Sequence, residues 1–266
     1  TKLSQATVMM GVPTFYTRLL NETNLAHSHI TNMRLFISGS APLLTETFNA
    51  FEARTSHKIL ERYGMTETGM IASNPLRGER RAGTVGLPLP EVEVRIADGN
   101  GLSLPQGAVG IVEVRGPNVF TGYWNRLKKT AEEFRAAGFF ITGDMGLIEA
   151  DGYLCLVGRA KDLIISGGLN VYPKEVEDAI DAIPGVIESA VFGIPHPDFG
   201  EAVAAAVTLL PTASVNEAEL IAALRPQLAS FKLPKRVFVV NALPRNAMGK
   251  VQKNILREEY GGTFSN

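Results

Sequence analysis

Short apolar runs alternate with helical patterns near the start of the chain, and this alternation limits the fold more than any other feature of the sequence. The apolar runs cover residues 8–12, 35–37 and 59–63, and a helical pattern with Phe48 and Phe51 on one face separates the last two. Strand, helix and strand in this order predict a parallel sheet. Ligands of such sheets bind beyond the carboxyl ends of the strands. Glycine-containing turns follow two of these runs, so we expect a binding site at that edge.

The middle of the chain has a different pattern. Across residues 86–157, apolar and polar residues alternate in short runs, as half-buried strands do. Turn signals such as Asp98-Gly99 and Asp151-Gly152 separate the runs. This segment is predicted to form a small antiparallel β subdomain.

After Lys161 the chain changes to a mixture of helix and strand patterns. The helical patterns cover residues 173–182 and 216–228, and the strand patterns cover residues 189–193, 203–209 and 237–240. A stretch of roughly a hundred residues with this content is typical of a small α+β domain. We therefore predict an α/β protein in two parts, divided into residues 1–160 and 161–266.

The bulk composition is that of a globular protein. Hydrophobic residues make up 45% and charged residues 20% of the chain, which is enough apolar material for a full core. The formal net charge of −1 gives no reason to expect nucleic acid or an anionic membrane as a partner. No apolar stretch is long enough to span a bilayer.

The single cysteine, Cys155, lies in the apolar run of residues 153–157. It cannot form an internal disulfide, and we interpret it as a buried strand residue of a protein in a reducing compartment, the cytoplasm. The chain opens without an initiator methionine or a signal-peptide pattern and leads directly into an apolar run. We therefore expect further sequence upstream of Thr1.

The segment from Tyr63 to Glu67 offers a hydroxyl and a carboxylate directly after a predicted strand. Gly64 permits close approach of the backbone, Thr66 supplies the hydroxyl, and Glu67 supplies a hard oxygen ligand. Such a pair beside a phosphate suits a Mg²⁺ ion shared with nucleotide oxygens. The alternative is a polar helix cap without a ligand.

Three further turns carry polar groups that suit an elongated ligand. Asp144 follows a glycine and could accept hydrogen bonds from both hydroxyls of a ribose, which Arg159 could also reach. The pair Gly167-Gly168 would let the backbone lie against an extended molecule. The alternatives are an ordinary turn aspartate and a charged turn between domains.

The segment from Pro244 to Lys250 is rich in turn residues and presents a lysine directly after a glycine. Lysine is a compact charge on a flexible stem, which suits a reacting group whose charge changes. The alternative is a solvated loop lysine.

Together and in this order, these segments resemble the signatures of the adenylate-forming superfamily of acyl-CoA synthetases, firefly-type luciferases and peptide-synthetase adenylation domains. The matching stretches are Tyr63–Glu67, Gly122–Asn125, Thr142–Asp144, Gly158–Gly168 and Pro244–Lys250. Within the superfamily, residues 11–20 and 34–43 are most similar to malonyl-CoA synthetases. The resemblance implies that residues 1–160 are the C-terminal part of a large ATP- and acid-binding domain, and that residues 161–266 form a small mobile domain.

The resemblance implies an ATP-dependent acid–CoA ligase that uses ATP, Mg²⁺ and coenzyme A. The acid, malonate or methylmalonate, would attack the α-phosphate of ATP, and the CoA thiolate would then displace AMP. Lys250, Thr66 and Glu67 would be catalytic, with Glu67 as the ligand of Mg²⁺. The residues implied to bind ATP or AMP are Gly39, Ser40, Ala41, Tyr63, Gly64, Met65, Thr66, Asp144, Arg159 and Lys250.

The remaining implied roles concern movement, coenzyme A and the acid. Lys161 matches the hinge of the superfamily, and Gly167 and Gly168 would face coenzyme A. Arg18 is our first candidate to pair with the second carboxylate of malonate, because a buried carboxylate needs a partner. Arg34 is the other cation expected nearby. The alternatives are that Arg18 caps a helix surface and that the acid is a short- or medium-chain fatty acid.

The phosphate loop of the superfamily, rich in Ser, Thr and Gly, has no match in this sequence and would lie upstream of Thr1. We therefore expect the 266-residue chain to be inactive by itself. One alternative is a non-catalytic fragment on which a lysine acetyltransferase and a deacetylase act at Lys250. Another is a peptide-synthetase adenylation domain, but no carrier-protein serine motif follows Lys250 before Asn266.

Overall fold

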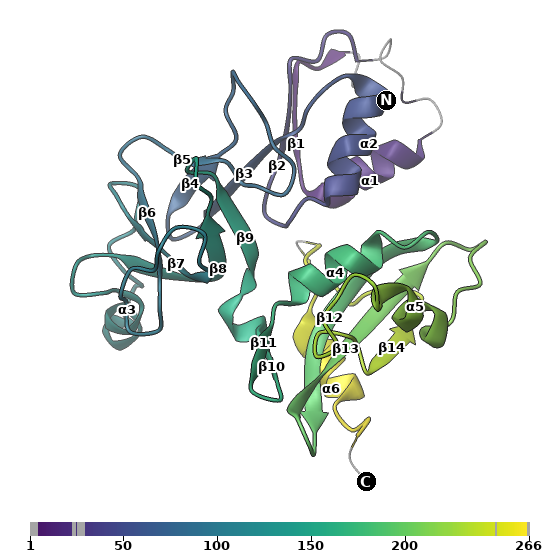
Figure 1. The fold of residues 1–266 in the computed structure, drawn as a ribbon. Coiled ribbons are helices and arrows are strands. Elements are labelled where there is room, and N and C mark those ends of the chain that lie inside the picture. The colour runs from purple at the N-terminus through teal and green to yellow at the C-terminus, as the bar shows by residue number, and fades with distance from the viewer. Residues whose placement is uncertain (1–4, 23–24, 26–29, 248, 265–266) are drawn as a thin grey trace. The chain divides into compact units, whose positions relative to one another are not determined.

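The computed structural model describes residues 5–22, 25, 30–247 and 249–264 (Figure 1). It divides into two compact units, residues 1–156 (unit 1) and 157–266 (unit 2). The mixed α/β fold class is confirmed, with a parallel sheet, an antiparallel β subdomain and a small α+β part. Within the described residues, no helix is long and apolar enough to cross a membrane.

The first sheet of unit 1 begins with the predicted parallel strands. Strand β1 pairs in parallel with β2, and β2 pairs in parallel with β3. Helices α1 and α2 lie on the same side of these strands (Figure 1) and bury Tyr16, Phe36 and Phe51 against one another. The bounds are β1 Val8–Gly11, α1 Pro13–Asn21, β2 Leu35–Ser38, α2 Thr45–Thr55 and β3 Leu60–Met65.

The sheet continues with an antiparallel hairpin. Strand β4 (Gly69–Ser73) pairs with β3, and the short β5 (Leu87–Pro88) pairs with β4. The hairpin turn therefore consists of Thr66, Glu67 and Thr68 and lies at the carboxyl end of β3. It follows that the polar residues predicted from this segment extend from the edge at which parallel sheets bind ligands.

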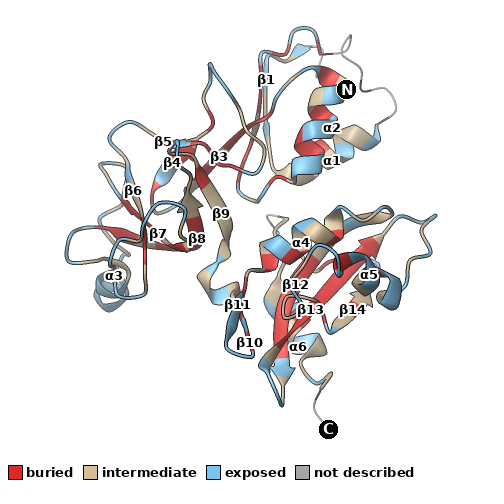
Figure 2. Cartoon of the chain, in the orientation of Figure 1, coloured by how far each residue is buried: buried red, intermediate tan, exposed pale blue. Residues whose placement is uncertain are grey.

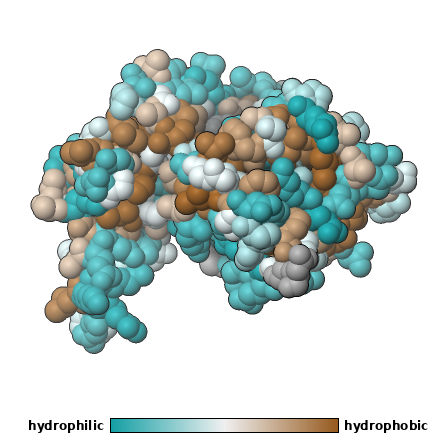
Figure 3. Space-filling model, turned by 60° about the horizontal axis from the view of Figure 1, so that its bottom comes forward, coloured by the Kyte–Doolittle hydropathy of each residue, from teal (hydrophilic) through white to brown (hydrophobic). Residues whose placement is uncertain are grey.

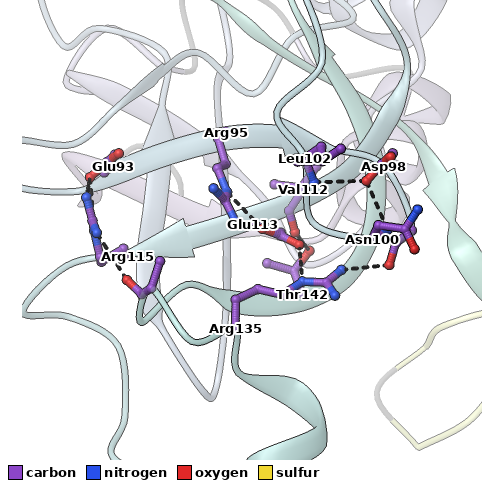
Figure 4. Close-up of polar contacts among 12 residues, drawn as sticks. Glu93, Arg95, Asp98, Asn100, Leu102, Val112, Glu113, Arg115, Arg135 and Thr142 are labelled. Carbon is purple, nitrogen blue, oxygen red and sulfur yellow. Dashed lines mark hydrogen bonds and ion pairs between the residues drawn. The ribbon is translucent and has the colours of Figure 1, made fainter.

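The antiparallel β subdomain forms the rest of unit 1, with strand order β6-β7-β8-β9 and helix α3 between β7 and β8 in the chain. Its core contains one buried ion cluster: the fully buried Glu113 accepts from Arg95 at 2.7 Å and from Arg135 at 2.7 Å (Figure 4). The bounds are β6 Glu93–Ala97, β7 Gly110–Arg115, α3 Leu127–Glu133, β8 Phe140–Ile148 and β9 Leu154–Arg159.

Cys155 lies in strand β9, as predicted, but it is only partly buried. The expectation of a fully buried residue is wrong, because the thiol points at a polar group: its Sγ lies 3.4 Å from Oε1 of Glu149. Burial and the Glu149 carboxylate raise the pKa of the Cys155 thiol to about 12. The residue is therefore an uncharged thiol at neutral pH.

Unit 2 is built around β13, which pairs antiparallel with β12 and parallel with β14. Residues 202–207 of β13 are all buried, because helices cover both faces of the sheet (Figure 2). Helices α4 and α5 pack with the odd-numbered residues of this run, and α6 packs with the even-numbered ones. The bounds are β10 Ile164–Ser166, β11 Leu169–Val171, α4 Pro173–Asp181, β12 Val186–His196, β13 Gly200–Leu209, α5 Glu217–Leu224, β14 Arg236–Val239 and α6 Lys253–Tyr260.

Candidate functional site

The turn after β2 places Gly39, Ser40 and Ala41 at the carboxyl edge of the parallel strands. Gly39 is buried against the side chain of Arg62 in β3: a Cβ at Gly39 would lie 2.8 Å from the guanidinium carbon. Ser40 is exposed and has a φ of 70°, in the left-handed region that few non-glycine residues adopt. The backbone of this turn is therefore accessible from solvent at Ser40, where a flat ligand could lie against it.

The hairpin turn between β3 and β4 presents Thr66 and Glu67. Thr66 is exposed and Glu67 is partly exposed, whereas the next residue, Thr68, is fully buried. Gly64 is required here by the chain itself, because a Cβ at this position would lie 2.1 Å from the carbonyl oxygen of Gly69. The close approach predicted for Gly64 is therefore made by the opposite strand of the hairpin.

Tyr63 and Asp144 were predicted as separate nucleotide contacts, and the structure brings them together. The Tyr63 hydroxyl donates a hydrogen bond to Oδ2 of Asp144, and both residues are buried. The backbone N–H of Asp144 in turn donates to the Thr142 hydroxyl at 3.1 Å. Asp144 is therefore held from two sides before any ligand binds.

Glu67 is in contact with Tyr123, a residue to which the sequence assigned no role. The Tyr123 hydroxyl lies 3.1 Å from Oε1 of Glu67 and 2.7 Å from Oε2 of Glu133 in α3. The Phe120 N–H also donates to the Glu67 carbonyl oxygen at 2.8 Å. The segment around Gly122-Tyr123 therefore supports the hairpin turn, which explains why it belongs with the Glu67 signature.

Three arginines of unit 1, Arg18, Arg34 and Arg62, lie near the first sheet in different positions. Arg18 is exposed in the last turn of α1, and Arg34 is exposed just before β2, at the opposite end of that strand from Gly39. Arg62, in contrast, lies within β3 with its Nε buried and without a hydrogen-bond partner. Its Nη2 lies 3.9 Å from Sδ of Met10 in β1. Sequence patterns did not single out Arg62, because it looks like any polar residue of an alternating strand.

In unit 2, the loop that carries Lys250 is a tight hairpin. The Lys250 N–H donates to Oδ1 of Asn246 at 2.9 Å, and the Asn246 N–H donates to the Lys250 carbonyl oxygen at 2.9 Å. Nη1 of Arg245 donates to the Gly249 carbonyl oxygen at 2.7 Å, and Nη2 pairs with Glu188 of β12. Met248 lies outside the described residues. The backbone of Lys250 is thus fixed to the central sheet of the unit.

The other predicted residues of unit 2 lie at its start and are exposed. Arg159 ends β9, and Lys161 lies in a single 3₁₀ turn, residues 160–162. Gly167 and Gly168 form the turn between β10 and β11 with φ values of 58° and 79°. Two consecutive left-handed residues are what a two-residue hairpin turn requires, so the turn alone explains the glycine pair.

Within the part of the chain that the structure describes, no group of three or more His, Cys, Asp and Glu side chains could hold a metal ion. Mg²⁺ does not need such a group, because it usually binds one or two carboxylates and completes its shell with phosphate oxygens and water. Glu67 fits that position: it is partly exposed, follows Thr66 directly in the chain, and has one oxygen in contact with Tyr123.

Comparison with known proteins identifies the class. The AMP-binding enzyme family matches residues 2–124, and the C-terminal domain of AMP-binding enzymes matches residues 175–250. The chain belongs to this adenylate-forming family. The first match covers most of unit 1, and the second covers the lysine loop of unit 2.

Three individual relatives illustrate which proteins the chain is similar to. The crystal structure of ATP-bound MatB from Rhodopseudomonas palustris is 55% identical with a TM-score of 0.97, over 99% of this chain and 53% of that chain. Malonate–CoA ligase of Arabidopsis thaliana is 39% identical over 95% of this chain and 44% of its own length. A long-chain-fatty-acid–CoA ligase of Yersinia pestis is 36% identical over 95% and 45%. The chain thus spans about half the length of the relatives it matches.

Proposed function

We propose that this chain is the C-terminal part of an ATP-dependent acid–CoA ligase that activates malonate or methylmalonate through an acyl-adenylate. The main support is the arrangement in unit 1, where the Gly39-Ser40 turn and Glu67 follow the ends of β2 and β3, and Tyr63 of β3 bonds to Asp144 of β8 in the neighbouring sheet. The 39% identity to the malonate–CoA ligase of Arabidopsis thaliana, over 95% of the chain, supports malonate as the acid.

In the proposed reaction, a carboxylate oxygen of the acid attacks the α-phosphorus of ATP, and pyrophosphate leaves. The CoA thiolate then attacks the carbonyl carbon of the acyl-adenylate and releases AMP. Asp144 would accept hydrogen bonds from the ribose hydroxyls, and Arg159 would donate to the ribose. Tyr63 would orient Asp144, and Gly39, Ser40 and Ala41 would line the adenine. Mg²⁺ would neutralise phosphate charge, with Glu67 as its protein ligand and Thr66 touching phosphate.

Lys250 would lie between the carboxylate and the α-phosphate as negative charge develops, because a lysine stabilises such charge when its backbone is fixed and its stem can reach. Lys161 would be the point at which unit 2 turns between the two half-reactions, and Gly167 and Gly168 would then face the pantetheine arm of CoA. Cytoplasmic location and acetylation of Lys250 by an acetyltransferase stay predictions without further support from the fold.

The choice of acid depends on a cation for the distal carboxylate. Arg18 was the first candidate, but Arg62 has the stronger geometry: its Nε is buried without a partner at the strand ends, next to Gly39. A buried donor that lacks a partner gains the most from an incoming carboxylate. We therefore propose Arg62 as a second candidate to bind the acid, beside Arg18.

The test compares Arg18→Met, Arg62→Met and the control Arg34→Met in a full-length ligase that contains this chain, with malonate and butyrate as substrates and pyrophosphate release as readout. Loss of one partner of a buried charge pair costs roughly 3–5 kcal/mol. Substitution of the arginine that binds the acid should therefore raise the KM for malonate by orders of magnitude and leave the KM for butyrate unchanged. Equal effects on both acids would make that arginine structural. A wild type that never accepts malonate would reduce the proposal to a general acyl-CoA ligase.

A further inference from the structure

The hydroxyl of Tyr123 lies between two carboxylates. It is 3.1 Å from Oε1 of Glu67 and 2.7 Å from Oε2 of Glu133. A phenol has a single proton to donate, so it can satisfy only one of the two oxygens at a time. This arrangement joins the hairpin turn of β3 and β4 to helix α3, which follows it by more than fifty residues in the sequence.

The position of the Tyr123 ring does not depend on Glu67. The Tyr123 N–H donates to the Thr130 hydroxyl of α3 at 2.9 Å, and the ring meets Phe120 edge to face at 4.8 Å between centroids. Phe120 in turn packs on Phe140 of β8 at 5.4 Å. The hydroxyl is therefore placed by the aromatic core of the β subdomain, and it offers Glu67 a fixed hydrogen-bond donor.

The main chain around Glu67 is held by the same segment. The Phe120 N–H donates to the Glu67 carbonyl oxygen at 2.8 Å, and Nδ2 of Asn118 donates to the Thr68 carbonyl oxygen at 2.7 Å. Residues 118–123 thus contact both the backbone and the side chain of the hairpin turn. A glutamate whose backbone and carboxylate are both hydrogen-bonded has few orientations left, and such restraint preorganises a metal ligand.

Charge balance indicates which carboxylate depends on Tyr123. Glu133 has a counter-charge of its own, since Nζ of Lys129 lies 3.1 Å from its Oε1. Among the described residues, the interactions of the Glu67 side chain consist of the contact with Tyr123. The proton is thus available to Glu67 while Lys129 neutralises Glu133.

We propose that Tyr123 is a positioning residue: its hydroxyl restrains Oε1 of Glu67, so that the carboxylate would be held ready to ligate Mg²⁺. This inference rests on the proposed function, in which Glu67 ligates the metal. Lys129 and Glu133 act indirectly. Glu133 competes with Glu67 for the hydrogen bond of the Tyr123 hydroxyl, and Lys129 pairs with Glu133. Carboxylates that ligate metals are commonly held by such outer hydrogen bonds, whose loss lowers metal affinity about 10–100-fold.

The test measures Mn²⁺ binding, as a paramagnetic probe for the Mg²⁺ position, by electron paramagnetic resonance at a fixed concentration of ATP in the full-length ligase. Tyr123→Phe removes the hydroxyl and keeps the ring on Phe120. We expect it to weaken Mn²⁺ binding about 10–100-fold, and we expect excess metal to restore adenylate formation. Thioester formation from a supplied acyl-adenylate should keep its wild-type rate, because pyrophosphate has already left.

Tyr153→Phe is the matched control, because the Tyr153 hydroxyl donates to the Glu79 carbonyl oxygen and does not contact the site. If Tyr123→Phe binds Mn²⁺ as this control does, or slows both half-reactions alike, the positioning role is overturned. Glu67→Gln separates the two proposals. If Glu67→Gln weakens Mn²⁺ binding and Tyr123→Phe does not, only the inference about Tyr123 is lost. If Glu67→Gln binds Mn²⁺ normally, Glu67 is not the ligand and both are lost.

Discussion

The two units hold their candidate residues in opposite ways. In unit 1, the side chains bond to one another: Tyr63 donates to Asp144, and Tyr123 donates toward Glu67. In unit 2, the lysine loop is held through its backbone groups: the Lys250 N–H donates to the Asn246 side chain, and the Lys250 carbonyl oxygen accepts from the Asn246 N–H. The exposed Lys161 and the Gly167-Gly168 turn continue this pattern.

This difference suits two different tasks. Side chains that are already bonded and buried lose little freedom when a ligand arrives, so unit 1 has the properties of a preformed binding surface. A lysine on a fixed loop keeps a mobile stem and can reach a charge that exists only during reaction. On the face shown in Figure 3, hydrophobic residues lie in patches among hydrophilic ones.

The largest effect that tests this contrast is expected from Lys250→Ala. In a full-length ligase, loss of a group that stabilises transition-state charge should lower the rate of adenylate formation by about 10²–10³. Thioester formation from a supplied acyl-adenylate should be spared, because the proposed role of Lys250 belongs to the first half-reaction. Pyrophosphate release and thioester formation, measured separately, check this.

Lys58→Ala is the control for Lys250→Ala, since Lys58 is an exposed lysine of unit 1 that pairs with Glu52 on the surface. It should leave both half-reactions unchanged. If Lys250→Ala slows both half-reactions equally, the loop serves the structure of unit 2 and not the chemistry of one step. The contrast between unit 1 as a binding surface and unit 2 as the carrier of a catalytic lysine would then be wrong.

Much of the fold could be predicted from sequence because it depends on local patterns. Alternating apolar runs located the parallel strands, and the turn dipeptides located the antiparallel subdomain. The helix predicted over residues 216–228 ends early, at Leu224, because Pro226 lacks an N–H and disfavours a helical Arg225. Its start was readable, since Asn216 and Glu219 form a capping box.

The contacts that define the site could not be predicted in the same way. Tyr63 and Asp144 are 81 residues apart, and Glu67 and Tyr123 are 56 apart. No periodicity or spacing rule connects residues at such separations; only the packing of one sheet beside another brings them together. Signature resemblance placed Tyr63, Glu67 and Asp144 on the same ligand, but it gave no reason for Tyr123 or Arg62.

Glu113 of unit 1 and Asp181 of unit 2 extend the comparison, because both place carboxylate oxygens inside the fold. Glu113 is fully paired. Arg95 and Arg135 each lie 2.7 Å from one of its carboxylate oxygens. Glu113→Ala would leave both arginines without their partner, so we expect a loss of about 3 kcal/mol in unfolding free energy, at the low end for buried pairs because the arginines are partly exposed. Urea denaturation followed by circular dichroism measures this loss.

The control for Glu113 is Glu93→Ala. Glu93 pairs with Arg115 on the same two strands, but its side chain is 55% exposed. An exposed pair contributes at most about 1 kcal/mol. If the two variants lose the same stability, the cluster in Figure 4 is no more than a surface network, and unit 1 lacks the preorganised core that the comparison assigns to it.

The smallest predicted effect concerns Asp181 of unit 2, a partly buried acid without full pairing. Oδ1 of Asp181 is buried with no hydrogen-bond partner, and burial, aided by the Glu177 charge, raises the pKa of this carboxyl to about 7 against an opposing hydrogen bond from Ser189. The folded state therefore retains a proton that the unfolded chain loses near pH 4. The contribution of Asp181 to stability is greatest below about pH 4 and falls as the pH rises toward 7.

Asp181→Asn should remove this decline, because an amide keeps its proton count at every pH in this range. At pH 8 we expect the variant to be more stable than the wild type by about 1–3 kcal/mol, the cost of leaving a buried polar group unsatisfied, and at pH 4 to show no advantage. Asp178→Asn is the control, since Asp178 pairs with Lys174 and its side chain is 51% exposed. Urea denaturation midpoints of the wild type and the two variants, measured at both pH values, test this prediction. An Asp181→Asn curve parallel to the wild type would mean that Asp181 is charged and satisfied in the folded state, as Glu113 is, and the two units would then treat their buried acids alike.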